Sequence, residues 1–489
     1  MTDRKSLHGV RFLTGTDSYK LGHWQQYPTG TTGVYSNFTA RGARISDVDA
    51  AVLFGLQAFL DDWCGDAFQD FLALPEDEAV ATYAARVAAI AGASDDDFAR
   101  VRGLHRLGYL PLRICAVPEG TAVPLRMPML TVENTYPDFF WLTNYIESAM
   151  SAFLWHPITS ATLAHRLRTM LNGYAQASAG STEFVGWQGH DFSLRGLEGI
   201  AAAGASGAGH LLSFTGTDSL PAMDFVDMHY PGDNGLLGGS PPATEHAVMC
   251  AGGELNERDT YLRLLKLYPA GLVSVVSDTW DFWNVITEIL PSLHAEIMSR
   301  DGKLVIRPDS GDPVKIICGD PDAPAGSPAQ RGLVVLLGGQ FGTTVNAAGY
   351  KELDSHIGMI YGDSITYERA QQMCEGLMAL GYASTNIVLG VGSFTYQYVT
   401  RDTLGMAMKA TWVEVDGVGR DIFKAPKTDN GTKRSAKGRL ALLPDGDSML
   451  LVEGATPEEE KASLLQPVWC DGQFLRRQSF AQVREVLWP

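Results

Sequence analysis

The feature that most constrains this chain is a pattern repeated between residues 184 and 400, in which a short apolar run precedes a polar turn. The pattern occurs six times, and each turn carries Gly, Asp, Ser or Arg. The runs and their turns are Phe184-Val185 before 190–195, Leu211–Phe214 before 216–218, Val273–Val276 before 277–281, Leu304–Ile306 before 307–311, Ile357–Ile360 before 362–363, and Ile387–Leu389 before 390–393. Helical segments separate the runs, which indicates an α/β architecture with parallel strands. Parallel α/β barrels carry their reactive groups at the carboxyl ends of strands, so these turns predict a site assembled there.

The sequence on either side of this region has a different character. Its segments are a strand at 35–39, a solvated helical pair at 76–108, strands at 112–117 and 129–132, an apolar helix at 139–155, and strands after 401 with a cationic loop at 424–439. We therefore expect an irregular parallel α/β barrel over 151–400 and a second, β-rich α+β domain built from 1–150 with 401–489.

Composition argues against several classes of function. The chain of 489 residues has 38 Lys and Arg against 56 Asp and Glu, and its net charge of −18 disfavours nucleic acid as a partner. A local cluster of cations can still bind a small phosphorylated substrate within a Debye length of about 8 Å. Apolar runs of about 18 residues and a secretory signal are absent, so we expect neither membrane insertion nor export. The six scattered cysteines lack CxxC or metal-ligand spacing, which indicates reduced thiols and a cytoplasmic location.

Three side chains describe a pocket for a flat ring with a polar substituent. Phe192 can stack on the ring, while Arg195 and Asp218 can hydrogen-bond the substituent. A carboxylate accepts hydrogen bonds from an amide but repels another carboxylate, so Asp218 favours a carboxamide over the corresponding acid. The alternative interpretation is that Asp218 is an ordinary Asx-turn residue.

Two other turns could bind phosphate. The guanidinium of Arg307 suits bidentate contact with phosphate, and the turn Pro308–Gly311 would expose N–H donors, although a structural ion pair between Arg307 and Asp309 is the alternative. Gly390-Val-Gly392 could form a phosphate cradle or an ordinary tight turn, and it lacks the GxGxxG of a dinucleotide fold.

His246 is the candidate for proton transfer or for phosphate acceptance on nitrogen. Glu245 beside it and Asp281 from a neighbouring strand end could orient the imidazole and raise its basicity. A hydrogen-bonded structural histidine is the alternative. A metal site is a further interpretation for the histidines His165, His190 and His210. The sequence lacks the HxH or HExxH spacing that would support it.

Taken together, these motifs resemble the nicotinamide phosphoribosyltransferase family, nearly end to end and in the family's order. The motifs are Thr16–Lys20, Trp141–Asn144 with Glu147, His190–Phe192 with Arg195, Gly216–Asp218, Glu245-His246, Ser277-Asp278, Ile306–Gly311, Gly362-Asp363 and Lys433–Arg439. The resemblance implies a type II phosphoribosyltransferase-like barrel that joins nicotinamide to 5-phosphoribosyl 1-pyrophosphate (PRPP). The products are nicotinamide mononucleotide, an NAD precursor, and pyrophosphate, which Mg²⁺ accompanies.

The resemblance also implies roles for individual residues. His246 would be phosphorylated by ATP, which couples ATP hydrolysis to synthesis, with Asp281 as its orienting acid. Phe192 and the Tyr19 of a second subunit would sandwich the nicotinamide ring, with Asp218 and Arg195 at its carboxamide, so the active protein would be a homodimer with shared sites. The expected phosphate and ribose contacts are Arg41, Ser240, Ser277, Arg307, Asp309, Gly362, Asp363, Gly392, Ser393, Arg401, Lys424 and Lys433. No side chain is assigned as a metal ligand.

The departures from the family pattern are local. Pro241 follows Ser240 where a β-branched residue is expected, and Ser393 replaces a usual glycine of the phosphate loop. The loop 42–51 is short and the loop 427–433 differs in sequence. Two alternatives stay open: a nicotinate or quinolinate phosphoribosyltransferase, which would need a cation facing the substrate acid, and a non-catalytic binding or signalling protein on the same fold.

Overall fold

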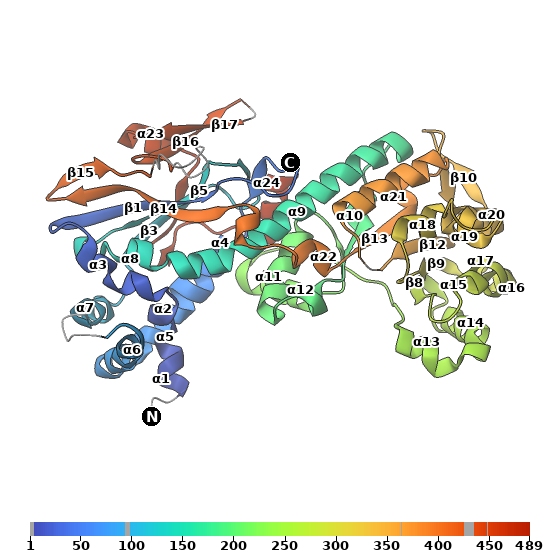
Figure 1. Cartoon of the computed structure of the whole chain (residues 1–489), viewed down its shortest axis with the longest axis horizontal. Helices are drawn as coiled ribbons and strands as arrows, with labels where there is room; N and C mark the ends of the chain where they lie inside the picture. Colours follow the sequence, from blue (N-terminus) through green and yellow to red (C-terminus); the bar gives the residue numbers. More distant parts are fainter. Residues whose placement is uncertain (1–3, 93–97, 363, 425–434, 447) are drawn as a thin grey trace. The chain divides into compact units, whose positions relative to one another are not determined.

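The computed structural model describes residues 4–92, 98–362, 364–424, 435–446 and 448–489. The chain divides into two compact units, a sheet unit and a barrel unit (Figure 1). The sheet unit comprises 1–162, 226–234 and 399–489, and the barrel unit comprises 163–225 and 235–398. Helix α9 (Glu147–Ala179) begins in the sheet unit and ends in the barrel unit. In the described part of the chain, no helix is both long and apolar enough to cross a membrane.

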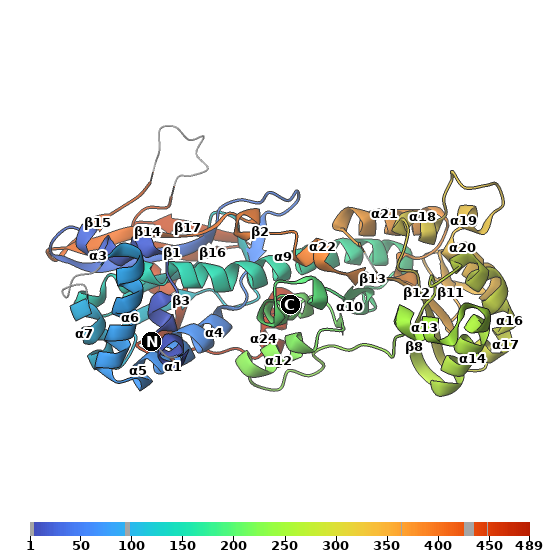
Figure 2. The ribbon, with the colours of Figure 1, turned by 60° about the horizontal axis from the view of Figure 1, so that its bottom comes forward.

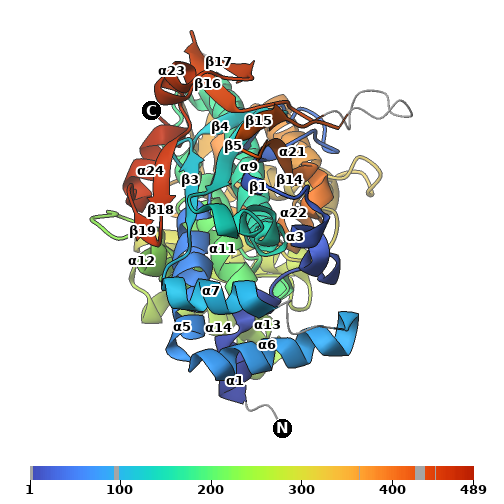
Figure 3. The same ribbon diagram turned by 90° about the vertical axis from the view of Figure 1, so that its left-hand side faces the viewer.

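The sheet unit is built on one seven-stranded sheet in which all neighbours are antiparallel. In spatial order the strands are β15 (Val418–Asp421), β14 (Met406–Val415), β1 (Thr31–Ala40), β5 (Pro128–Asn134), β3 (Leu112–Ala116), β18 (Gln466–Cys470) and β19 (Gln473–Phe474). Helices α5 (Phe68–Ala73), α6 (Glu76–Ala91) and α7 (Ala99–Leu107) lie together on one side of this sheet (Figure 3). The sheet therefore joins N- and C-terminal segments that lie far apart in sequence.

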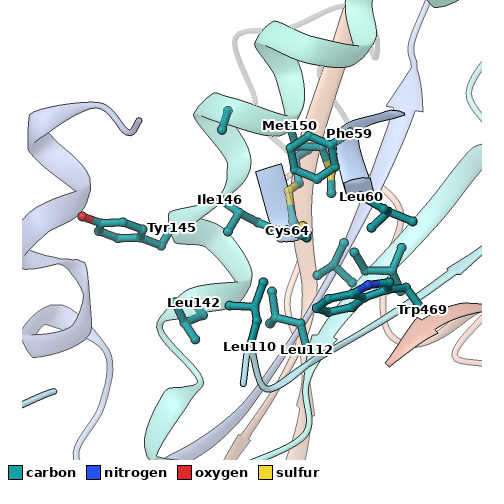
Figure 4. Close-up of a cluster of buried hydrophobic side chains, with 14 of the residues drawn as sticks. Phe59, Leu60, Cys64, Leu110, Leu112, Leu142, Tyr145, Ile146, Met150 and Trp469 are labelled. Carbon is teal, nitrogen blue, oxygen red and sulfur yellow. The ribbon is translucent and has the colours of Figure 1, made fainter. Parts of the chain in front are cut away.

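Helices pack on this sheet through a large apolar core. Trp469 of β18, Leu112 of β3 and Met150 of α9 are among its fully buried members (Figure 4). Cys64 lies in the same core, where burial raises the pKa of its thiol. Burial of apolar surface contributes about 25 cal/mol per Å², so this core stabilises the packing of these segments on one another.

The expected helix over 139–155 is interrupted. The structure has the short helices η4 (Pro137–Phe139) and α8 (Leu142–Tyr145) before α9 begins at Glu147. The interruption falls between Tyr145 and Glu147, where the carbonyl of Tyr145 accepts the hydroxyl of Thr16 at 2.9 Å and its own hydroxyl donates to the carbonyl of Leu13 at 2.6 Å.

The barrel unit is built on six parallel strands. In spatial order they are β7 (Gly216–Thr217), β6 (Gly189–Asp191), β13 (Ile387–Val391), β12 (Ile357–Tyr361), β9 (Asp301–Arg307) and β8 (Ala270–Val276). Helices α18 (Pro313–Cys318) and α21 (Tyr367–Ala379) lie on one side of these strands, and α13 (His246–Gly252) and α14 (Glu257–Leu267) on the other (Figure 2).

The two edges of this sheet are linked by the segment 239–243. Gly239 forms a parallel bridge with Gly216 of β7, and Ala243 forms one with Ser274 of β8. The amide of Thr217 donates to the carbonyl of Gly239 at 3.1 Å, and that of Ser274 to Pro242 at 2.9 Å. Pro241 and Pro242 carry no N–H, so this segment cannot form a regular strand. The unit is thus an irregular parallel α/β barrel, as the sequence predicts.

Two predicted strands have a different structure. Val185 begins the helix α10 (Val185–Gln188), and Leu211 ends the helix α11 (Ile200–Leu211). The strands that follow these helices are short: β6 has three residues and β7 has two. A short apolar run fits a buried helical turn as well as a buried strand, which explains the error.

Candidate functional site

The strand register brings the polar turns to one edge of the barrel. Asp191 at the end of β6 pairs with Thr217 of β7 and with Val391 of β13. On the other side, Arg307 at the end of β9 pairs with Val276 of β8. Because all six strands are parallel, the turns that follow them share the carboxyl edge of the sheet, where parallel barrels place their sites.

The expected ring pocket lies at the ends of β6 and β7. The rings of His190 and Phe192 are 4.6 Å apart, and the amide of Phe192 donates to the carbonyl of Val391 at 2.9 Å. A Cβ atom at Gly390 would lie 2.8 Å from the Phe192 ring, so only glycine leaves room for the aromatic side chain there. The backbone thus fixes one wall of a pocket able to stack a flat ring.

Asp218 forms the polar wall of this pocket. Its Oδ1 accepts hydrogen bonds from His190 Nε2 at 2.9 Å and from Ser240 Oγ at 2.5 Å. Burial raises the pKa of Asp218, but these two hydrogen bonds and the charge of Arg307 outweigh burial and lower it overall. Asp218 is therefore ionised at neutral pH and presents a negative charge to the pocket.

A cavity of about 960 Å³ opens from this pocket into the barrel. Phe192, Asp218, Ser240 and Arg307 all line it, so the ring pocket and the principal candidate for phosphate binding share one space. A single pyridine ring would fill only part of that volume.

Arg307 lies at the end of β9, and only part of its guanidinium is hydrogen-bonded within the described part of the chain. Nη2 donates to the carbonyl of Thr244 at 2.7 Å, whereas Nε is buried and has no hydrogen-bond partner among the described residues. A Cβ atom at Gly362 would lie 3.4 Å from Arg307 Cδ and 2.3 Å from Asp309 Oδ1. Arg307, Asp309 and Gly362 are therefore immediate neighbours.

The turn after Arg307 is fixed by Asp278. Asp278 Oδ2 accepts the amide of Asp309 at 2.8 Å and the hydroxyl of Ser310 at 2.6 Å. The hydroxyl of the buried Tyr361 donates to the carbonyl of Ser310 at 2.8 Å. These contacts hold the turn at both its backbone and its side chains.

His246 begins α13 and faces two carboxylates. Its Nε2 lies 3.8 Å from Asp278 Oδ1 and 3.8 Å from Asp309 Oδ2, and its Nδ1 lies 3.2 Å from the hydroxyl of Thr279. The imidazole is 46% exposed. It can accept a group on nitrogen from solvent while the carboxylates orient the ring.

Two predicted contacts are placed differently from the expectation. Asp281 Oδ1 accepts the amide of Asn284 at 3.0 Å and caps the helix α15 (Phe282–Asn284). Among the residues that the structure describes, the carboxylates within ion-pair distance of His246 are instead those of Asp278 and Asp309. Ser277 is fully buried. Its hydroxyl accepts a hydrogen bond from the hydroxyl of Tyr261 at 2.8 Å and donates one to the carbonyl of Val275 at 2.8 Å. A direct phosphate contact from that hydroxyl would require these bonds to break.

The remaining barrel residues lie on neighbouring turns. Gly392 precedes the helix α22 (Ser393–Tyr396). The first N–H groups of a helix have no acceptor within the helix itself. Arg195 lies in η5 (Leu194–Gly196), and a Cβ atom at Gly196 would be 2.6 Å from Ser393 Cβ. The turn carrying Arg195 is thus in contact with Ser393.

The sheet unit carries the other predicted residues. Tyr19 is 63% exposed in η1 (Ser18–Gly22), Arg41 donates from Nε to the carbonyl of Gly405 at 2.9 Å, and Arg401 pairs with Asp402 at 3.0 Å. The amide of Lys424 donates to Ser435 Oγ at 2.8 Å. Asp363 and Lys433 lie outside the described residues.

Two residues with functional character were missed as site residues. Asp278 was visible only as part of the Ser277-Asp278 motif, and its role needs the fold. Lys409 of β14 is half-buried; burial lowers its pKa, Glu147 opposes this, and the charges of Arg41, Lys20 and Lys424 lower it further. Lys409 and Lys20 lie 3.9 Å and 2.6 Å from carboxylate oxygens of Glu147, so these cations gather around an acid, and nothing in the sequence around Lys409 signals this cluster.

Glu257, at the start of α14, is a buried acid beside this site. Burial raises its pKa to about 7, with further contributions from Asp281 and Glu254, and its Oε1 has no hydrogen-bond partner among the described residues. An unfolded glutamate titrates near ~4.3. Because the folded-state pKa is the higher one, the stability contributed by the protonated form is complete below about pH 4 and is lost as pH rises through about 7.

We therefore expect Glu257→Gln to raise the free energy of unfolding by roughly 1–2 kcal/mol at pH 8.5, after discounting for solvent screening, and to have less effect at pH 5.5. Urea unfolding at ~pH 5.5 and ~8.5 measures the difference. Glu485→Gln, at an exposed position of the helix α24 (Phe480–Leu487), is the control. An equal gain at both pH values for Glu257→Gln would contradict the assignment.

Comparison with known proteins places the chain among pyridine phosphoribosyltransferases. The model of the nicotinate phosphoribosyltransferase (NAPRTase) family matches residues 187–473, and that of the nicotinamide phosphoribosyltransferase N-terminal domain matches residues 11–70. The chain is 46% identical over 488 residues to a nicotinamide phosphoribosyltransferase of Acinetobacter baylyi, covering 97% of this chain and 96% of that protein. It is 35% identical to one of Xanthomonas campestris pv. campestris, covering 96% and 97%.

Solved structures share the fold at low sequence identity. A nicotinate-nucleotide pyrophosphorylase from Pyrococcus furiosus aligns with a TM-score of 0.57 at 15% identity, covering 98% of this chain and 95% of that one. Human nicotinic acid phosphoribosyltransferase aligns with a TM-score of 0.52 at 16% identity, covering 96% and 92%. These likenesses support the barrel with its added sheet unit.

Proposed function

Because the chain belongs to the nicotinamide phosphoribosyltransferase family, a family of pentosyltransferases, we propose that it makes nicotinamide mononucleotide and pyrophosphate from nicotinamide and PRPP. The observation that carries the choice of nicotinamide is the ionised Asp218 in the ring pocket. Its carboxylate accepts a hydrogen bond from a carboxamide and repels the carboxylate of nicotinate.

The chain's residues position the reactants more than they move protons. Phe192 supports one face of the pyridine ring, with Arg195 and Asp218 at the carboxamide. Arg307, Gly362, Gly392 and Ser393 hold the 5-phosphate, and Asp309 holds the ribose hydroxyls. The ring nitrogen then forms its bond to C1 of the ribose while the C1–O bond to pyrophosphate breaks and the electron pair leaves with pyrophosphate. The site's task is to stabilise the positive centre and the departing anion.

The exposure of Tyr19 supports a shared site. This ring is 63% exposed, so its face is open to contact with another surface. We assign the partner subunit's Tyr19 to the second face of the nicotinamide ring, which makes the homodimer the active form. Arg41, Arg401, Lys424, Lys433 and the newly recognised Lys409 would then supply positive charge to the phosphates.

Mg²⁺ fits the site as a companion of the substrate. Among the described residues, no three His, Cys, Asp or Glu side chains form a cluster able to hold a metal by themselves. Mg²⁺ commonly binds one or two carboxylates together with substrate phosphates, and Asp309, next to the proposed phosphate ligand Arg307, could supply one of them. When bound, the ion supplies positive charge to the departing pyrophosphate.

ATP coupling is assigned to His246. A ring nitrogen takes the γ-phosphoryl group, ADP leaves with the electron pair of the broken P–O bond, and water later hydrolyses the phosphohistidine. The exposed ring beside Asp278 and Asp309 supports this assignment. With His246→Ala we expect ATP hydrolysis and ATP stimulation to be lost while uncoupled synthesis persists. Equal ATP stimulation in the variant and the wild type would remove the histidine's role.

The assignment of substrate is tested by turnover. Purified protein is given PRPP and Mg²⁺ with nicotinamide or nicotinate, with and without ATP, and both mononucleotides are quantified. We expect nicotinamide to be preferred by at least ~100-fold, since a buried like-charge contact changes binding by several kcal/mol. The match to the nicotinate phosphoribosyltransferase family keeps that activity as the second candidate, and faster turnover of nicotinate would favour it. No mononucleotide from either ring would exclude both.

A glycine pair tests the phosphate side of the site. Gly362→Ala puts a Cβ atom 2.3 Å from Asp309 Oδ1, so Asp309 must shift, and we expect kcat/KM for PRPP to fall about tenfold. Gly392→Ala is the matched change, because a Cβ atom there meets nothing within 4 Å. Its loss should be smaller than that of Gly362→Ala. The reverse order would show that Asp309 is not held in place by Gly362.

The cysteines support a cytoplasmic location. All six are free, and burial raises the pKa of Cys115 to about 11 and of Cys318 and Cys374 to about 12. Thiols in this state are protonated and suit a reducing compartment.

A further inference from the structure

His190 and Ser240 bind the same oxygen of Asp218. His190 Nε2 lies 2.9 Å and Ser240 Oγ 2.5 Å from Oδ1, and among the described residues neither forms a hydrogen bond to Oδ2. The Asp218 side chain is 43% exposed and lines the cavity together with His190 and Ser240. One carboxylate oxygen is therefore engaged by the protein, and the other is left for the cavity.

The imidazole of His190 is held rigidly. It is only 8% exposed, on a strand whose neighbours are Gly390 of β13 and Gly216 of β7. A Cβ atom at Gly216 would lie 2.9 Å from His190 Nδ1, and the Phe192 ring packs at 4.6 Å on the same imidazole. With a carboxylate as its partner, Nε2 carries the proton and donates it.

Ser240 is held by the segment that links the barrel's edges. The amide of the preceding Gly239 donates to the carbonyl of Thr215 at 2.8 Å, and Pro241 and Pro242 follow. The hydroxyl that the sequence assigned to phosphate or ribose is thus already directed at Asp218.

We propose that His190 and Ser240 are positioning residues that determine specificity: they fix Asp218 so that Oδ2 alone addresses the substituent of the pyridine ring. This inference rests on the proposed function. Two donors on Oδ1 prevent the carboxylate from rotating and keep it charged, and a charged, fixed acceptor is what separates a carboxamide from a carboxylate. Neither residue needs to touch the reacting atoms.

The test compares donor-free and donor-retaining variants of full-length enzyme. His190→Phe keeps a ring without the donor, and we expect KM for nicotinamide to rise about tenfold. The kcat and the KM for PRPP should stay within about twofold, and the preference for nicotinamide over nicotinate should fall about tenfold. His190→Gln supplies an N–H donor and should recover most of both losses. Ser240→Ala should shift the same two quantities in the same direction, by about threefold to tenfold.

Controls separate this inference from folding and from the proposed function. His294→Phe changes an exposed histidine that stacks on Phe341 and should alter none of these quantities. Thermal melting shows whether His190→Phe folds, and if it does not, Ser240→Ala decides. An unchanged KM and preference in a folded donor-free variant would overturn the inference, as would a glutamine variant no better than phenylalanine. A wild type that makes no mononucleotide would instead overturn the proposed function, and this inference with it.

Discussion

Replacing Arg307 with alanine is expected to lower kcat/KM for PRPP about a thousandfold, with a much smaller change in the KM for nicotinamide. Its Nε is buried without a partner among the described residues, and its side chain adjoins Asp309 and Gly362. Each charge-assisted hydrogen bond contributes about 1.5–3 kcal/mol, so losing two removes about 4 kcal/mol, or roughly three orders of magnitude.

The geometry of the guanidinium can be separated from its charge. Arg307→Lys keeps the charge without bidentate contact and should recover only part of the loss. Arg258→Ala, on the exposed face of α14, is the matched control and should change kcat/KM by less than about twofold. Steady-state kinetics with varied PRPP measures all three variants. A loss below tenfold in a folded Arg307→Ala protein would show that the phosphate is held elsewhere.

Replacing Asp278 with alanine is expected to lower turnover by at least ~100-fold and to reduce the free energy of unfolding by about 2–4 kcal/mol. One of its oxygens accepts the Asp309 amide and the Ser310 hydroxyl, and the other faces His246 at 3.8 Å. Without this carboxylate two donors lose their acceptor and the turn after Arg307 is released.

Asp281→Ala provides the contrasting variant. Asp281 caps the short helix α15, so its removal should cost about 1 kcal/mol of stability and less than tenfold in turnover. Urea unfolding and steady-state turnover, each with and without ATP, compare the two. An effect of Asp281→Ala equal to that of Asp278→Ala would restore Asp281 as the orienting acid of His246.

The sequence predicted the barrel because apolar runs followed by polar turns recur six times, although the runs at Val185 and Leu211 are helical in the structure. Arg307, Asp218 and Gly390 each follow or end an apolar run, and parallel strands must bring such turns to one edge. The family motifs then identified the chemistry, because their order and spacing extend along nearly the whole chain.

Contacts that depend on side-chain direction could not be read in this way. Ser240 lies between turn residues that look equivalent in sequence, and only the fold shows that its hydroxyl binds Asp218. Asp278 and Asp281 are three residues apart, yet one faces His246 and the other caps a helix. Local sequence fixes neither choice, because both depend on where the next strand ends.

The sequence also contains no sign that one segment links the two edges of the barrel sheet. The segment 239–243 contains two prolines and has no strand pattern, but it bridges β7 and β8 through backbone atoms. Backbone pairing of this kind does not depend on side-chain type, so periodicity cannot reveal it.

A crystal structure of the protein with nicotinamide mononucleotide would show whether one cavity at the carboxyl edge of the barrel holds both halves of the product. We expect the carboxamide nitrogen at about 3 Å from Asp218 Oδ2, the pyridine ring against Phe192, and the 5-phosphate on Arg307. A mononucleotide bound away from Asp218, or with its phosphate out of reach of Arg307, would contradict this expectation.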